Sequence, residues 1–173
     1  MSGPIKPAIR YLELCSELTG RFVSWLALMM VIVTVAVVIL RYGFSVGSVG
    51  MQESITYLHA AVFLIGAAYT LKRDAHVRVD IFYRSFSARG KAWVNALGSL
   101  VFLLPLCGFI LFISWDFVAA SWRIREASGN ADGLPLVFLL KTMIPVMAIT
   151  LAAQGLAEAL KSLATLMVGE EDD

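Results

Sequence analysis

Residues 22–40 read FVSWLALMMVIVTVAVVIL, which is 19 residues without a charge. A helix of about 20 apolar residues crosses the hydrocarbon core of a bilayer, which is about 30 Å thick. The stretch is apolar around its whole circumference, whereas a helix on the surface of a soluble protein keeps one polar face. The sequence therefore predicts a membrane-spanning helix over these residues.

Three further stretches have the same character. They are residues 54–71, residues 92–115 with a continuation to residue 122 across Asp116, and residues 136–160. These runs are uniformly apolar rather than alternating, and backbone groups in lipid must be hydrogen-bonded within a helix or a closed barrel, so we predict helices. The composition agrees, with 59% hydrophobic and 16% charged residues and a mean hydropathy of +0.79. We predict an all-α membrane protein, with four transmembrane helices in one bundle that forms a single domain over residues 1–173, including a tail at 161–173.

The positions of Lys and Arg predict the orientation in the membrane. Ten of the 14 basic residues lie in the N-terminal segment, the second connection and the C-terminal tail, against four in the first and third connections. Because basic residues collect on the cytoplasmic side, both termini are expected in the cytoplasm. The net charge of +1 includes no basic or acidic run that would bind nucleic acid.

The segment ahead of the first span has an amphipathic pattern. Ile5, Ile9, Leu12 and Ser16 recur at helical spacing, and charged residues occupy positions between them. This pattern predicts a short helix over about residues 5–19, lying on the cytoplasmic face of the membrane with a bend at Gly20. An extension of the first span is the alternative.

Small residues form a stripe on the fourth span. Ala148, Ala152, Gly155 and Ala159 share one helix face. Small side chains let two helices approach closely in a membrane, so this face is expected to contact another helix. Gln154 on the same span is the best candidate for a polar hydrogen bond between helices.

Few residues of the chain are suited to chemistry. A b-type haem commonly takes two His ligands, but the two here, His59 and His76, are expected on opposite sides of the membrane. Cys15 and Cys107 likewise fall in different settings, so neither a disulfide nor a metal pair is expected. We predict no catalytic, metal or cofactor site and no enzyme activity, with bound phospholipid as the expected ligand. The open alternatives are a transporter subunit, a membrane anchor of a quinone-linked respiratory complex, and a small dimeric exporter, which would need an acidic residue deep in a span.

Two groups of residues resemble those of a known family. The first lies around the second span and comprises Arg41, Tyr42, Phe44, Gln52, Glu53, His76, Val77, Val79 and Asp80. The second comprises Trp122, Glu126, Ser128, Gly133, Leu134, Pro135, Lys141, Pro145 and Gln154. Their order and placement against four spans resemble the small membrane subunit of tripartite ATP-independent periplasmic (TRAP) transporters, the DctQ-like family.

The resemblance implies a function and two partners. In such systems a periplasmic binding protein delivers a substrate, often an organic acid, to a large multi-span permease subunit driven by a Na⁺ or H⁺ gradient. The small subunit is similar to a fixed scaffold beside the large one. We interpret the residues that carry the resemblance, together with the small-residue stripe, as contacts within the bundle, with the partner subunit or with lipid.

Roles are assigned to some of these residues as hypotheses. His76 and Asp80 are expected to fix the turn after the second span, and Arg73 and Arg78 to meet anionic lipid headgroups. Arg41 is expected to pair with Glu53 across the first connection, at a position where such a pair contributes little.

Overall fold

The computed structural model describes residues 5–76, 81 and 83–168, and these residues are largely helical. Its elements are α1 (Ile5–Gly43), α2 (Val49–Lys72), the 3₁₀ turn η1 (Tyr83–Ser85), α3 (Ala88–Leu97), the π-helical turn η2 (Gly98–Leu103), α4 (Leu104–Arg123) and α5 (Val137–Val168). The described part of the chain has no strand, which confirms the predicted all-α class.

Four helical stretches are long and apolar enough to span a membrane, which confirms the predicted number. They are Ile9–Gly43, Val49–Lys72, Ala88–Arg123 and Val137–Met167. The third consists of α3, η2 and α4 in direct succession, so it reaches beyond Trp122 as expected. Pro105 lies at the start of α4, immediately after η2. A π-helical turn accommodates the backbone carbonyl that the proline ring leaves without its usual partner.

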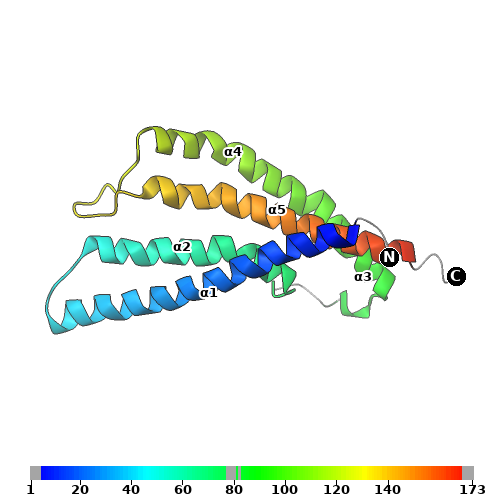
Figure 1. Ribbon diagram of the computed structural model, residues 1–173, viewed down its shortest axis with the longest axis horizontal. Coiled ribbons are helices and arrows are strands. Elements are labelled where there is room, and N and C mark those ends of the chain that lie inside the picture. Colours follow the sequence, from blue (N-terminus) through cyan, green and yellow to red (C-terminus); the bar gives the residue numbers. More distant parts are fainter. Residues whose placement is uncertain (1–4, 77–80, 82, 169–173) are drawn as a thin grey trace.

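Helix α5 lies at the centre of the bundle. It packs against α1, α2, α3 and α4, while α1 also packs along α2 (Figure 1). The beginning of α1 and the end of α5 lie at one end of the molecule, here called the terminal end. The connections 44–48 and 124–136 lie at the other end, here called the loop end. This up-and-down arrangement puts the termini of the bundle on the same side.

The prediction of a separate N-terminal surface helix is wrong. Helix α1 runs unbroken from Ile5 to Gly43, with no bend that separates residues 5–19 from the span. Ile9 and Ser16, which belong to the expected membrane-facing stripe, are buried in the bundle instead. The segment is amphipathic because one of its faces packs on the other helices.

Gly20 provides close packing in the middle of α1 rather than a bend. A Cβ atom at this position would overlap the ring of Tyr69 in α2. The absence of a side chain therefore lets the Tyr69 ring lie directly against the α1 backbone. This contact packs α1 closely against α2 at the place where the sequence suggested a bend.

The helices are also longer than the predicted spans. Helix α5 continues to Val168 and includes most of the expected tail, whose last residues, 169–173, lie outside the described part. The small-residue stripe of α5 lies at helix contacts, since Ala148 and Ala159 are buried and a Cβ on Gly155 would come within 2.6 Å of Leu103. Ala152 is partly buried on the same helix.

Candidate functional site: polar clusters at the two ends of the bundle

A buried hydrogen-bond chain joins α1 to α5 near the terminal end. The Ser16 hydroxyl donates to Gln154 Oε1 at 2.7 Å, and Gln154 Nε2 donates to Glu158 Oε1 at 3.0 Å. The Gln154 side chain is fully buried. A buried amide needs partners for both its donor and its acceptor, and Ser16 and Glu158 supply one for each. Gln154 therefore forms the kind of interhelical bond that the sequence suggested.

This chain of hydrogen bonds ends at Glu158 in a group of ion pairs. Lys161 lies 3.1 Å from Glu158 Oε1 and also contacts the carboxylate of Glu13 in α1. Charges in a membrane protein are tolerated where they are paired. The Lys161 ammonium thus lies between two carboxylates of different helices and connects the first turns of α1 with the last turns of α5.

A second ion-pair group connects α1 to the end of α2. Glu17 accepts hydrogen bonds from Lys72 Nζ at 2.8 Å and from an Arg73 guanidinium nitrogen at 2.9 Å. The Glu17 carboxylate raises the pKa of the Arg73 guanidinium. The Arg73 guanidinium also lies 5.2 Å from the centre of the Tyr69 ring, so it is held on both sides. The structure thus shows Arg73 in an ion pair within the chain.

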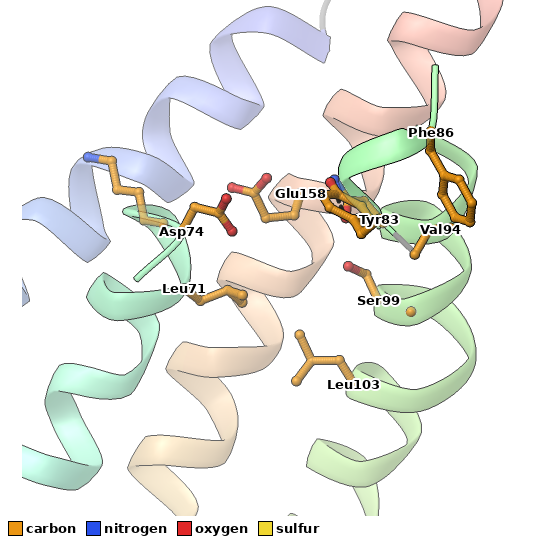
Figure 2. A pocket seen from close by; sticks show the side chains of 11 residues that line it. Leu71, Asp74, Tyr83, Phe86, Val94, Ser99, Leu103 and Glu158 are labelled. Carbon is orange, nitrogen blue, oxygen red and sulfur yellow. Dashed lines mark hydrogen bonds between the residues drawn. The ribbon is translucent and has the colours of Figure 1, made fainter. Parts of the chain in front are cut away.

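A cavity of about 610 Å³ opens beside these groups, between the end of α2, α3, η2 and α5. Its lining comprises Leu71, Lys72, Asp74, Tyr83, Phe86, Val94, Asn95, Gly98, Ser99, Leu103 and Glu158. Figure 2 shows the carboxylates of Asp74 and Glu158 on one side of it and the apolar side chains of Leu71 and Leu103 deeper along the helices. The cavity is therefore amphipathic.

The other candidate residues at this end are described only in part. His76 is exposed just after α2. Arg78 and Asp80 lie outside the described residues. The suggested role of His76 and Asp80 in fixing the turn therefore stays a prediction.

At the loop end, Glu53 of α2 binds the connection between α4 and α5. Its carboxylate accepts hydrogen bonds from the Ser128 hydroxyl at 2.5 Å, from Asn130 Nδ2 at 2.9 Å and from the Leu134 backbone N–H at 2.7 Å. A Cβ on Gly133 would come within 2.9 Å of the same carboxylate. One side chain thus fastens a long connection to the start of α2.

This arrangement corrects the expected pair of Arg41 and Glu53. Both oxygens of the Glu53 carboxylate are bonded to the 128–134 segment. Arg41 and Tyr42 are exposed at the end of α1. The α4–α5 connection carries three donors that converge on Glu53, and it outcompetes a single flexible guanidinium near the surface.

A second contact closes the same connection. Lys141 Nζ at the start of α5 lies 2.5 Å from Glu126 Oε2 and 4.0 Å from the centre of the Phe117 ring. The Lys141 ammonium holds the pKa of the Glu126 carboxyl below its ordinary value. Nearby, Trp122 Nε1 donates to the Thr142 hydroxyl at 2.8 Å, which ties the last turn of α4 to the first turns of α5.

The potential metal ligands of the described residues are dispersed. The described part of the chain holds no cluster of three or more His, Cys, Asp or Glu side chains that would bind a metal ion. His59 is exposed and stacks on Phe63 at 6.4 Å between ring centres. His76 follows 17 residues later, beyond the end of α2. The polar groups found at both ends join helices to one another.

The comparison with known families decides the identity. A family model for the DctQ component of tripartite ATP-independent periplasmic transporters matches residues 30–165, more than three quarters of the chain. This chain belongs to the DctQ family. No curated protein and no solved structure matches it. As a DctQ component, the chain is the small membrane subunit of a TRAP transporter and a multi-pass protein of the bacterial inner membrane.

The family match covers only part of the polar groups of this DctQ component. It includes the Glu53 contacts at the loop end and Gln154 in α5. It begins after Glu13 and Glu17, so the α1 carboxylates of the terminal-end ion pairs lie ahead of it, whereas their partners Lys72 and Lys161 lie within it.

Sequence reasoning missed both carboxylates of α1. Glu17 and Lys72 lie at similar distances from the short connection 44–48, on two antiparallel helices. Opposite charges at matching depths in such a hairpin are the signal that would have predicted the pair. Ser128 and Asn130 offered no comparable signal, because loop conformation decides where their side chains lie.

Proposed function

We propose that this DctQ component is a fixed scaffold for the large permease subunit and has no substrate pathway of its own. The supporting observation is that the charged contacts of the bundle lie near helix ends and join its helices to one another. The central residues 22–40, 54–71, 92–115 and 142–157 carry no charge. A substrate or ion pathway through a membrane needs polar or ionisable groups at midspan.

The rest of the proposed system follows the family. A periplasmic binding protein captures a small organic acid, and the large subunit takes it up with a Na⁺ or H⁺ gradient. Ten basic residues against four favour both termini in the cytoplasm, so that the terminal end faces the cytoplasm and the loop end faces the periplasm. Phospholipid is the ligand that best fits the amphipathic cavity beside Asp74 and Glu158.

Reconstitution tests the scaffold role. The tagged chain is expressed together with the large permease subunit of its transporter, and retention of the permease on the affinity resin is measured. Proteoliposomes that hold the pair and the binding protein should take up the organic acid under an imposed ion gradient. Equal uptake by the permease without this chain would contradict the proposal.

Two controls separate the alternatives. An anchor of a respiratory complex that binds haem would give a Soret absorption band in the purified chain, and we expect none.

Cysteine labelling tests the orientation. In intact spheroplasts, an impermeant maleimide should label a cysteine placed at Gly129, which is exposed in the loop. The exposed native Cys15 should be labelled only after permeabilisation. The reverse pattern would contradict the orientation.

A further inference from the structure

Helix α1 has a row of exposed apolar side chains on the face that points away from the bundle. The row begins with Tyr11, Leu14, Leu18, Trp25, Leu28 and Ile32 and continues to Tyr42. With Arg21 between Leu18 and Trp25, its positions alternate at intervals of three and four residues. We call the row from Tyr11 to Tyr42 the outer seam. An average spacing of 3.5 residues is the repeat with which two long helices pack along each other.

The outer seam lies opposite a seam that is already occupied. Ser16 contacts Gln154 of α5, Gly20 contacts Tyr69 of α2, and Val23 contacts Gly66 of α2. Leu18 follows Ser16 by two positions and Trp25 follows Val23 by two positions, which is about 200° around a helix. Helix α1 thus has two contact faces with the same repeat, and the chain itself fills one of them.

Lipid tails do not account for the first part of the outer seam. Helix α1 has 39 residues, about 58 Å, whereas a hydrocarbon core is about 30 Å thick. Tyr11 lies 11 residues, about 16 Å, ahead of the charge-free run that begins at Phe22. Its side chain is 69% exposed, and that of Leu18 is 58% exposed. A contiguous row of exposed large apolar side chains marks a contact with a protein or with a membrane, and the distance of Tyr11 from the charge-free run favours a protein.

Arg21 identifies the chemistry of the missing partner. It occupies the one position of the outer seam that is not apolar. Its side chain is 77% exposed and lies 4.0 Å from Glu17, whose carboxylate is bonded to Lys72 and Arg73 at shorter distances. The Arg21 charge is therefore weakly compensated within the chain. A carboxylate on a partner helix would complete the pairing.

A second copy of this chain does not meet that requirement. Two copies in one membrane have the same orientation, so their outer seams would meet as parallel helices. Parallel packing would place the two Arg21 side chains opposite each other, and like charges disfavour such a contact.

We propose that the outer seam of α1 binds one long helix of the large permease subunit, which packs along α1 in a left-handed crossing and carries an Asp or Glu opposite Arg21. This inference rests on the proposed function, because it names the face of the scaffold that meets the permease. Helix α1 then lies between the permease helix on one side and α2 and α5 on the other.

Site-specific cross-linking tests the assigned face. A photoreactive phenylalanine is placed at Leu18 or at Trp25, with Phe112 on α4 as the control, because Phe112 is also apolar and exposed. In the purified complex, the two seam positions should give adducts with the permease in at least about tenfold higher yield than the control. Mass spectrometry of the adduct should place both cross-links on one helix. Equal yields from Phe112, or adducts from the seam with lipid or with a second copy only, would overturn the inference.

A charge exchange tests the role of Arg21. The variant Arg21→Glu should retain about tenfold less permease on the resin, and Arg21→Lys should retain nearly all of it. The matched control is Arg123→Glu at the exposed end of α4. Circular dichroism and size-exclusion chromatography of each purified variant show whether the subunit itself is folded. Conversion of the facing carboxylate of the permease to Lys should restore binding to Arg21→Glu. Full retention by the folded Arg21→Glu variant would overturn the charge assignment.

The two proposals fail in different ways. If the unmodified chain retains no permease, the scaffold function is wrong and the seam has no partner. If the permease is retained but cross-links from Phe112 exceed those from Leu18 and Trp25, only the seam assignment is wrong.

Discussion

Ser16 and Gln154 lie 138 residues apart in the sequence and are joined by a hydrogen bond of 2.7 Å between α1 and α5. Gln154 also donates to Glu158, so its amide is bonded on both sides. Such bonds fix the rotation and the depth of one helix against another, which apolar contacts alone define poorly.

Replacement of Gln154 should destabilise the bundle. The variant Gln154→Leu removes the bond to Ser16 and leaves the Ser16 hydroxyl buried without it, at a cost of about 1–2 kcal/mol. The melting temperature in detergent should therefore fall. Gln52→Leu is the matched control, because Gln52 is exposed on α2. Equal melting temperatures for the two variants would show that the buried bond contributes nothing.

A methyl group at Gly20 should separate α1 from α2. The variant Gly20→Ala brings its Cβ into the Tyr69 ring, and overpacking of this kind costs about 1–3 kcal/mol. Thermal unfolding in detergent measures the loss. Gly108→Ala should be neutral, since a Cβ there meets no atom within 4 Å. The double variant Gly20→Ala, Tyr69→Ala should be less destabilised than the sum of its two single changes, and strict additivity would argue against the contact.

Neutralisation of Glu53 should loosen the α4–α5 connection. A Gln side chain at position 53 has one acceptor oxygen, so it cannot replace a carboxylate that accepts bonds from Ser128, Asn130 and Leu134. Hydrogen exchange over residues 128–134 should be about tenfold faster in Glu53→Gln, which corresponds to the loss of about 1.4 kcal/mol. Asp116→Asn, an exposed carboxylate change on α4, is expected to leave that exchange rate as it was.

The ion pair of Glu126 and Lys141 should respond to acid. The Lys141 ammonium lowers the pKa of the folded Glu126 carboxyl from its ordinary value of 4.5. The pair therefore stabilises the connection fully above about pH 4.5, and this contribution is lost as the pH falls through the lowered folded-state pKa. Between pH 7 and pH 5 the connection should not change.

A spin label reports this transition. With Cys15→Ser as background, a label on Gly129→Cys should become more mobile as the pH falls below 4.5 and through the lowered pKa of Glu126. In Glu126→Gln the label should be equally mobile at neutral and at acid pH. A transition that survives in Glu126→Gln would assign the acid response to another group.

The number and placement of the four spans could be predicted from the sequence. Partition into lipid depends on the summed apolar surface of about 20 consecutive residues. That sum is a local property, so the run at 22–40 was sufficient to identify the first span. The small-residue stripe around Ala148 and Gly155 was readable for a similar reason, since close approach needs small side chains at helical spacing.

The tertiary structure decided which polar groups meet. Glu53 was expected beside Arg41, but the path of the 124–136 connection brings Ser128 and Leu134 to its carboxylate. The amphipathic pattern of residues 5–19 was read as a membrane surface helix, but Ser16 and Gly20 pack on α5 and α2. Hydropathy gives the depth of a residue in the membrane but not the rotation of its helix. The rotation is fixed only when the helices pack, and it determines whether an amphipathic face meets lipid or protein and which charges come within reach.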